Sequence, residues 1–329
     1  MITSHDVARL AGVSQPTVSR ALRGDPRVSV TTREKVVRAA STLGYVRSEA
    51  GRGLVTRASF RVGVVVADLT NPFYPHLLAP LHDELGGLGY RTMVFTERPD
   101  SPIAVEQLLD GAIDGVVLAT STVGSPLPVE LARRGLPFVF LNRDSGAPGD
   151  AAVVDNELGG RLVAARMVEL GHRRIAGVFG PADTSTGRDR ELGFRRALAD
   201  AGLDLPPELT RRGPFEFETG DTAMTDLLRA GGVRPTAVFC GNDVIALGAL
   251  DAARRAGVPV PDEVSVAGFD DIPMAAWEAF RLTTVGHDLR GMAASAARLL
   301  VDRIAGGGEP RRVVLRPRLV ERATLTPPS

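Results

Sequence analysis

The segment from Ser14 to Arg20 carries side chains whose types and spacing suit the reading of DNA bases. A Gln amide can make two hydrogen bonds to adenine, and an Arg guanidinium can make two to guanine. Ser and Thr hydroxyls can reach bases or phosphates. The residues of this segment that we expect to contact DNA are Ser14, Gln15, Pro16, Thr17, Ser19 and Arg20.

Two short helices must hold these side chains. Thr3–Asp6 fits a capping box that opens a helix through Ala11, and Gly12 is suited to ending it. Ser14 can then cap a second helix that runs to about residue 23. This is the pattern of a helix-turn-helix, whose second helix places its N-terminal residues in the DNA major groove. The alternative is a helical hairpin with a solvated polar face.

A third helix completes the predicted N-terminal head. Thr31–Glu34 fits a second capping box, which predicts a helix from there to about Leu43. Apolar residues recur at helical spacing in all three segments and are expected to form one small core. They are Val7, Ala8, Ala11, Val18, Leu22, Val36, Ala39 and Leu43.

The distribution of charge favours DNA binding over the solvated hairpin. The 329-residue chain has 39 basic and 39 acidic residues, so its net charge is zero. Residues 1–58, however, carry ten basic and four acidic residues, a net +6 balanced by −6 in the remainder. A basic head on an acidic body indicates an anionic partner for the head alone.

From residue 60 onward, strand and helix patterns alternate. Repeated βα units predict parallel sheets covered by helices, and this many strands suits two doubly wound lobes. The expected strands are Val62–Ala67, Thr92–Phe95, Gly115–Leu118, Phe138–Leu141, Ala152–Val154, Ile175–Phe179, Ala237–Phe239 and Val264–Phe269. The expected helices include Pro75–Leu88, Gly159–Leu170, Arg190–Ala201, Asp243–Ala256 and Leu289–Ile304. The fold class is therefore multidomain, with an α head and an α/β body.

The domains predicted from these patterns are a head at 1–46, a polar linker at 47–58 and a two-lobed body at 59–329.

The chain has no GxGxxG after a strand, no GxxxxGK[ST], no HExxH and no GxSxG, and its five histidines are scattered. Its one cysteine, Cys240, excludes a disulfide framework or a multi-cysteine zinc site. We therefore predict no catalytic residues, no metal and no cofactor. No apolar run reaches the ~18 residues of a membrane span, and the N-terminus lacks a signal-peptide pattern, so a cytoplasmic protein is expected.

Several short segments, taken in order, are similar to the lactose-repressor/galactose-repressor (LacI/GalR) family of bacterial transcription regulators. The resemblance covers essentially the whole chain, which makes it more specific than any single motif. The segments are Asp6-Val7-Ala8, Ala11-Gly12-Val13-Ser14, Thr17-Val18-Ser19-Arg20-Ala21-Leu22, Leu43-Gly44-Tyr45, Asn71-Pro72-Phe73, Asp114-Gly115, Gly171-His172, Gly193-Phe194, Asn242-Asp243, Ala246 to Gly248 and Gly268-Phe269-Asp270.

This resemblance implies a dimer whose two heads read a palindromic operator, joined by hinge helices that enter the minor groove. Leu54 holds the position of the family's wedge residue, which unstacks a base step, and Arg52 is expected to contact phosphate. The hinge departs from the family, because Arg47 stands where proline is usual and Gly51 and Gly53 replace better helix formers. We therefore expect residues 48–56 to fold only in the operator complex.

The resemblance also implies a ligand cleft between two lobes like those of periplasmic sugar-binding proteins. The matching positions are Phe73, Asn142, Arg143, Arg190, Phe215, Asn242 and Asp270. The polar members could instead be ordinary loop caps, and Phe73 could be core. A sugar is the expected effector, with nucleosides and purines the next class. The residues leave open whether the effector releases DNA or promotes binding. We expect the protein to repress transcription, and activation of transcription is the alternative.

Two other function classes are weighed against a regulator. An enzyme on a doubly wound fold would need the catalytic motifs that the chain lacks. A transport-type sugar-binding protein would explain the lobes but not the basic head. We therefore expect double-stranded operator DNA, a small polar effector and a second copy of this chain as partners, and no membrane.

Overall fold

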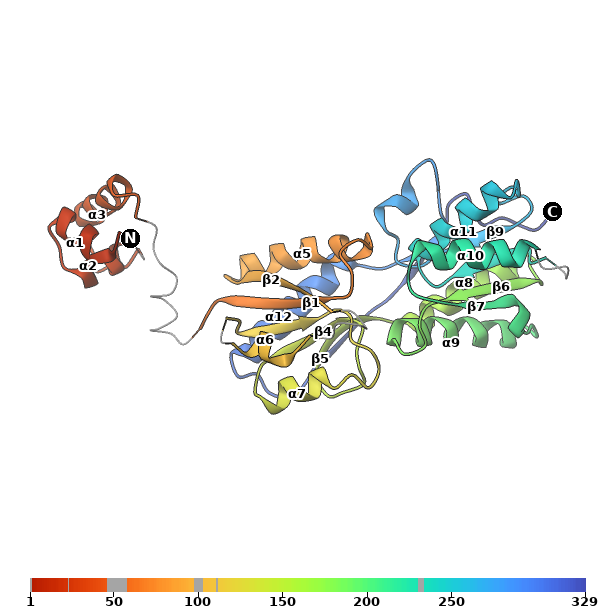
Figure 1. The fold of residues 1–329 in the computed structure, drawn as a ribbon, viewed down its shortest axis with the longest axis horizontal. Helices are drawn as coiled ribbons and strands as arrows, with labels where there is room; N and C mark the ends of the chain where they lie inside the picture. The colour runs from red at the N-terminus through yellow and green to blue at the C-terminus, as the bar shows by residue number, and fades with distance from the viewer. Residues whose placement is uncertain (1, 23, 46–57, 98–102, 111, 230–233) are drawn as a thin grey trace. The chain divides into compact units, whose positions relative to one another are not determined.

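The computed structural model describes residues 2–22, 24–45, 58–97, 103–110, 112–229 and 234–329 (Figure 1). Contacts divide the chain into two compact units, Met1–Ser59 and Phe60–Ser329. The predicted hinge residues Arg47, Arg52 and Leu54, and the glycines beside them, lie outside the described residues.

The first unit contains three helices around a small apolar core. The backbone N–H and the hydroxyl of Thr3 donate to the Asp6 carboxylate at 2.9 and 2.7 Å, which fixes the start of the first helix as predicted. Val7, Val18 and Val36, one from each helix, are fully buried together. The helices are α1 (Ser4–Ala11), α2 (Gln15–Ala21) and α3 (Val30–Thr42).

The predicted start of the third helix is wrong. Helix α3 begins at Val30, and its N-cap is Ser29, whose hydroxyl accepts the N–H of Thr32. The expected box at Thr31–Glu34 therefore lies inside the helix. Two overlapping Ser/Thr signals occur here, and buried Val28 sits directly before the one that is used.

The second unit consists of two α/β lobes. The first lobe is built on a six-stranded parallel sheet of order β11-β5-β4-β3-β1-β2. Helices α5 and α12 pack on the face that carries Val64, and α6 and α7 pack on the face that carries Val65. Its elements are β1 (Arg61–Val66), α5 (Phe73–Gly87), β2 (Arg91–Thr96), α6 (Val105–Leu109), β3 (Gly115–Leu118), α7 (Leu127–Arg133), β4 (Phe138–Asn142), β5 (Asp150–Val154), α12 (Leu289–Ile304) and β11 (Arg312–Leu315).

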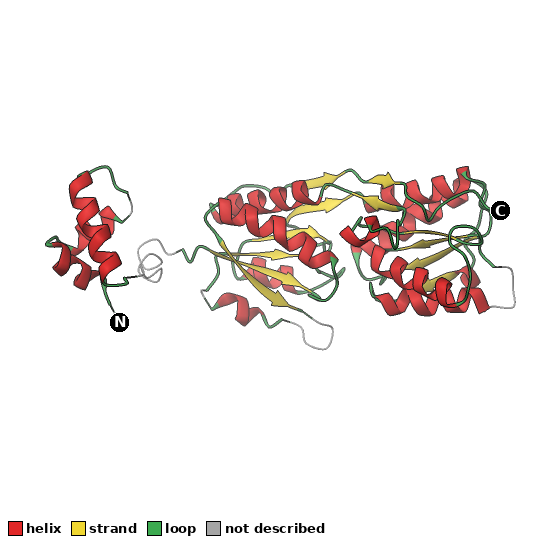
Figure 2. Ribbon diagram, turned by 90° about the horizontal axis from the view of Figure 1, so that it is seen from above, coloured by secondary structure: helices red, strands yellow, loops and turns green. Residues whose placement is uncertain are grey.

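The second lobe repeats the architecture with a parallel sheet of order β7-β6-β8-β9. Figure 2 shows the strands of each lobe lying between helices. Its elements are α8 (Asn156–Glu169), β6 (Ile175–Phe179), α9 (Ser185–Asp200), the 3-10 turn Pro207–Leu209, β7 (Thr210–Arg212), α10 (Phe217–Arg229), β8 (Ala237–Cys240), α11 (Asp243–Arg255), β9 (Ser265–Ala267) and the 3-10 turn Pro273–Ala276.

The chain crosses between the lobes three times. It enters the second lobe between β5 and α8, returns between β10 (Thr284–Gly286) and α12, and leaves again between β11 and β12 (Arg318–Val320). The last two crossings run side by side, because β10 and β12 form an antiparallel pair. All eight predicted strands are present. The additional strands β7, β10, β11 and β12 are three or four residues long and too short to show a period.

Reciprocal glycines bring the helices of the second lobe into close contact. A Cβ on Gly160 would overlap the carbonyl oxygen of Arg190, and one on Gly193 would overlap that of Glu157. The same arrangement joins α10 and α11 through Gly220 and Gly248. Helices α8 and α9 therefore touch backbone to backbone at Arg190, which fixes the place from which its side chain departs.

We expect Gly160→Ala and Gly193→Ala each to destabilise the protein by about 1–3 kcal/mol, because the new methyl group must displace backbone. Thermal unfolding followed by circular dichroism measures the effect. Gly86→Ala on α5 is the matched control, because a Cβ there meets nothing within 4 Å. Equal melting temperatures for all three variants would contradict the proposed close packing.

Candidate functional site

The polar residues predicted to read DNA lie at the start of α2. Ser14 is the N-cap in extended backbone, and the side of α2 that carries Val18 and Ala21 packs into the head. Ser14, Pro16 and Arg20 are exposed, whereas Gln15, Thr17 and Ser19 are half-buried. The fold therefore presents the first turns of α2 at the surface of the head.

Two hydrogen bonds within the head already hold part of this set. The Gln15 Nε2 donates to the Ser4 hydroxyl at 3.2 Å, and the Ser14 and Thr17 hydroxyls share a hydrogen bond of 2.8 Å. Gln15 thereby links α1 to α2 and keeps its carbonyl oxygen and second N–H for another partner. Its orientation is fixed before any DNA is bound.

All seven residues predicted to hold an effector line one cavity between the two lobes. They lie at the carboxyl ends of parallel strands and in the loops and helices that follow them, where ligands of open α/β sheets bind. We name this space the effector cavity. It is lined by Phe73, Asn142, Arg143, Arg190, Phe215, Asn242 and Asp270, together with Asn71, Tyr74 and Thr186.

Arg190 is the centre of this cavity. Its Nη2 donates to Asp270 Oδ1 at 2.8 Å, its Nε to Asn156 Oδ1 at 2.9 Å, and its Nη1 to the Gly241 carbonyl oxygen at 2.8 Å. The guanidinium carbon lies over the ring of Phe269, 3.7 Å from its centroid. The residue is 2% exposed. Because the guanidinium is planar and hydrogen-bonded on three sides, its remaining N–H groups point in a fixed direction.

Asp270 closes the ion pair from strained backbone. Its φ is +110°, a conformation that L-residues rarely adopt, and Asn142 across the cavity has a φ of +68°. Burial raises the pKa of Asp270, and the charge of Arg190 and its hydrogen bond act in the opposite direction. The charge of Arg143 also lowers the pKa of Asp270, and Arg190 is its ion-pair partner.

Two buried polar atoms in the cavity wall have no hydrogen-bond partner among the described residues. They are the Asn142 Oδ1, an acceptor, and the Arg143 Nε, a donor. The Arg143 guanidinium lies over the Phe215 ring, 5.1 Å from its centroid. Because an unpaired buried polar group costs free energy, these atoms point to a polar ligand that would satisfy them.

Asn242 and Phe73 have structural roles as well. The Asn242 Oδ1 accepts the N–H of Ile245 and caps α11, which is the alternative weighed from the sequence. Phe73 is buried against Tyr74 in an edge-to-face contact with ring centroids 5.6 Å apart. Each residue also lines the cavity, so its contact with an effector stays a prediction beside the structural role.

The lobes are closed over the cavity by hydrogen bonds between their loops. The Asn71 Nδ2 donates to the Phe215 carbonyl oxygen at 2.9 Å, and the Val123 N–H donates to the Asp183 carbonyl oxygen at 2.7 Å. The cavity volume is only about 20 Å³. That is space for about one water molecule, far less than the several hundred Å³ of a typical ligand pocket.

Sequence reasoning missed four residues of this site. Asn71 stands in the Asn71-Pro72-Phe73 segment, which was recognised but not assigned to the cavity. Tyr74 follows Phe73 directly, and Thr186 lies one helical turn before Arg190 on α9, so spacing along the chain could have indicated both. Asn156 carries no such signal, because only tertiary packing brings it to Arg190. Asn156 in particular follows a strand by two residues and resembles any helix-start asparagine.

Comparisons with known proteins cover both the head and the two-lobed unit. Residues 3–48 match the model of bacterial regulatory proteins of the lacI family, and residues 164–325 match that of a periplasmic binding protein-like domain. An HTH-type transcriptional regulator, CelR, of Thermobifida fusca is 39% identical over 330 residues, with 96% of each chain covered. This chain belongs to the LacI family.

Solved structures of LacI-family members extend the comparison to three dimensions. The complex of the regulator CelR with cellobiose is 35% identical, covers 99% of this chain and 100% of its own, and has a TM-score of 0.73. The lac repressor dimer bound to operator and the anti-inducer ONPF is 28% identical over 99% of each chain, with a TM-score of 0.88. These relatives are transcriptional regulators.

Within the described ranges, no helix of this LacI-family chain is long and apolar enough to cross a membrane. The same residues contain no group of three or more His, Cys, Asp or Glu side chains placed to hold a metal ion. Cys240 is fully buried, and burial raises the pKa of its thiol.

We expect Arg190→Met to destabilise the protein by about 3–5 kcal/mol at pH 8, because Asp270 then stays buried without a partner. Without Arg190 the carboxyl's folded pKa rises further above its unfolded value. The folded state then binds the extra proton, and stability falls as pH rises through that range. Urea unfolding at pH 5 and pH 8 should therefore show a smaller loss at pH 5.

The double variant Arg190→Met with Asp270→Asn is the control for this experiment. It removes both charges and should recover much of the lost stability. A loss that is equal at both pH values, or a double variant no better than the single one, would show that the ion pair does not account for the effect.

Proposed function

We propose that this LacI-family chain binds a palindromic DNA operator as a dimer and represses transcription. We further propose that a small polar effector of the sugar class, held in the effector cavity, controls that binding. The observation that carries the proposal is the convergence of Arg190, Asp270, Asn142 and Arg143 on one cavity walled by aromatic rings. The same chain carries the lacI-family head at residues 3–48, through which we expect the effector to change DNA binding.

The chemistry of the cavity favours a polyhydroxylated ligand. A sugar presents adjacent hydroxyls, each of which both donates and accepts, to a wall that offers both donors and acceptors. The unpaired Asn142 Oδ1 and Arg143 Nε provide one acceptor and one donor, and Asp270 adds acceptors. Phe73 and Phe215 can cover the apolar faces of a sugar ring. Cellobiose in the solved CelR complex supports the same class.

The control mechanism follows from the small volume of the closed cavity. A sugar cannot enter about 20 Å³, so the loop contacts at Asn71–Phe215 and Val123–Asp183 must open first. The lobes then close around the ligand in an arrangement different from the empty one. Strand β1 begins at Arg61, a few residues after the predicted hinge at 47–58, so a change between lobes reaches the hinge through covalent continuity. An effector shifts DNA affinity by as much as its preference for one arrangement.

DNA recognition is assigned to the first turns of α2. We expect Arg20→Ala to reduce the discrimination between operator and random DNA by about 1–3 kcal/mol, because one bidentate base contact is lost. Selection of genomic fragments by the purified protein yields the operator, and binding is then measured on operator and random duplexes. Arg38→Ala on α3 is the control and should leave the ratio of the two affinities unchanged. An equal loss on both duplexes would make Arg20 a phosphate contact.

Arg143→Met tests the effector cavity. Arg143 has no ion pair among the described residues, so its replacement should weaken the response to the effector at least ~10-fold while operator affinity stays the same. Titration of sugars suggested by the genes beside the operator provides the assay. Arg190→Ala should abolish the response too, but it also leaves Asp270 unpaired. An Arg143→Met protein with a normal response would refute this assignment of the cavity.

A further inference from the structure

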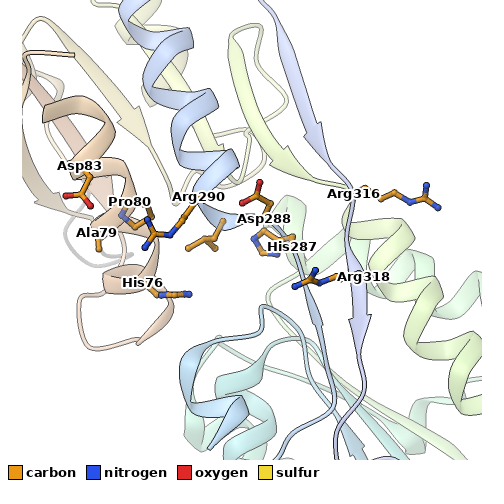
Figure 3. Close-up of a pocket in the computed structure, with 10 residues that line it drawn as sticks. His76, Ala79, Pro80, Asp83, His287, Asp288, Arg290, Arg316 and Arg318 are labelled. Carbon is orange, nitrogen blue, oxygen red and sulfur yellow. The ribbon is translucent and has the colours of Figure 1, made fainter. Parts of the chain in front are cut away.

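A second cavity lies where the last two crossings between the lobes pass the end of α5 that carries His76 (Figure 3). Its volume is about 500 Å³, which is within the range of small-molecule sites. We name it the crossing cavity. His76 and Asp83 come from α5, Arg290 from α12, Arg318 from β12, and His287 from the segment between β10 and α12. None of these residues lines the effector cavity.

The arginines of this cavity are unusual for this chain. Most arginines described in residues 60–329 form ion pairs or hydrogen bonds with other residues, as Arg303 does with Asp150 at 2.7 Å. For Arg290 and Arg318 the described residues provide neither. Figure 3 shows the Arg290 side chain extending towards α5 and the Arg318 side chain reaching the same opening, whereas Arg316 points away. Two guanidinium groups from different elements therefore share a cavity with unused donors.

His287 forms part of the wall and is also without partners. Both of its ring nitrogens are buried, and neither has a hydrogen-bond partner among the described residues. Burial lowers the pKa of His287 to about 3, with Arg190 and His76 acting in the same direction and Asp288 against it. The ring is therefore neutral at pH 7, and it carries one N–H donor that nothing in the described structure accepts.

The acidic residues of the wall form no ion pair with these arginines among the described residues. The Asp288 carboxylate accepts the N–H of Gly291 at 2.9 Å and so caps α12. Asp83 forms no ion pair among the described residues, and in Figure 3 its carboxylate points away from the opening. The cavity also contains the first residues of α12, a sixteen-residue helix whose N-terminus carries positive partial charge. Every nearby free donor thus favours a bound anion.

We propose that the crossing cavity binds a small phosphate-bearing molecule, at a site separate from the effector cavity. A phosphate group offers three acceptor oxygens and close to two negative charges, which match the forks of Arg290 and Arg318 and the N–H of His287. The cavity volume leaves room for the body of a small metabolite beside the phosphate. A phosphate alone is therefore the minimal probe.

A ligand here would act on the arrangement of the lobes. Arg290 is fixed to the first lobe through α12, whereas Arg318 and His287 belong to the two crossing segments that β10 and β12 pair together. A phosphate bound to all three would hold the crossing segments against α12. It would thereby favour one lobe arrangement, whichever effector occupies the other cavity.

The test is isothermal titration of the full chain with inorganic phosphate and with pyrophosphate, in chloride buffer of matched ionic strength. We expect saturable binding that the double variant Arg290→Gln, Arg318→Gln weakens at least ~10-fold. Arg298→Gln, on α12 but outside the cavity and without an ion pair among the described residues, is the matched control and should bind like the unmodified protein. His287→Phe, which keeps the ring volume and removes both nitrogens, should weaken binding as well.

Three outcomes would overturn the proposal. The first is no saturable binding of either probe to the unmodified protein. The second is equal binding by the double variant and the unmodified protein, both with intact thermal unfolding, which would place the anion elsewhere. The third is an altered monomer–dimer equilibrium of the double variant in sedimentation without any phosphate binding, which would show that a second copy of the chain covers the cavity. Sugar binding in the effector cavity is measured separately and does not decide between these outcomes.

Discussion

The buried ion pair between Arg190 and Asp270 is the interaction on which the rest of the effector domain depends. Placing a guanidinium and a carboxylate beyond the reach of water is costly, and only a complete set of partners offsets that cost. Asn156, the Gly241 carbonyl and the face of Phe269 complete the set for Arg190. The glycine contact between α8 and α9 fixes the backbone from which Arg190 departs. Packing of two helices thus determines where the charge in the cavity lies.

The same site shows why closing and opening of the lobes can be linked to a ligand. The ion pair belongs wholly to the second lobe, whereas the unpaired Asn142 Oδ1 and Arg143 Nε belong to the first. When the lobes close, the Arg190–Asp270 pair, whose hydrogen bonds are already made, comes to face Asn142 and Arg143, which each have a polar atom without a partner. A polar molecule that bonds to both sides has more to gain in one lobe arrangement than in the other, and that difference is what a regulatory ligand requires. In the crossing cavity, too, groups from different parts of the chain lack partners, and there they are the donors of Arg290, Arg318 and His287.

Much of this architecture could be predicted from the sequence, because the long elements carry strong periodic signals. The eight predicted strands and the residues of the effector cavity follow from apolar runs and from a family resemblance in which each residue has its place. The failures have local causes. Ser29 competed with Thr31 for the start of α3, and β7, β10, β11 and β12 are too short to show alternation. Asn156 reaches Arg190 only through tertiary packing, which no single-sequence pattern records.

The discontinuity of the first lobe bears on how this protein is made. Its sheet begins with β1 near residue 61, yet the edge strand β11 is formed by residues 312–315, and α12 on its face comes from residues 289–304. During synthesis, the emerging β1 to β5 segment lacks β11, the outer neighbour of β5, and lacks α12, which covers the Val64 face together with α5. The second lobe, by contrast, lies mostly between residues 156 and 276, so most of it emerges before α12 and β11. Completion of the N-terminal lobe therefore waits for the last residues of the chain to leave the ribosome, and a prematurely terminated chain would expose a bare β-edge prone to aggregation.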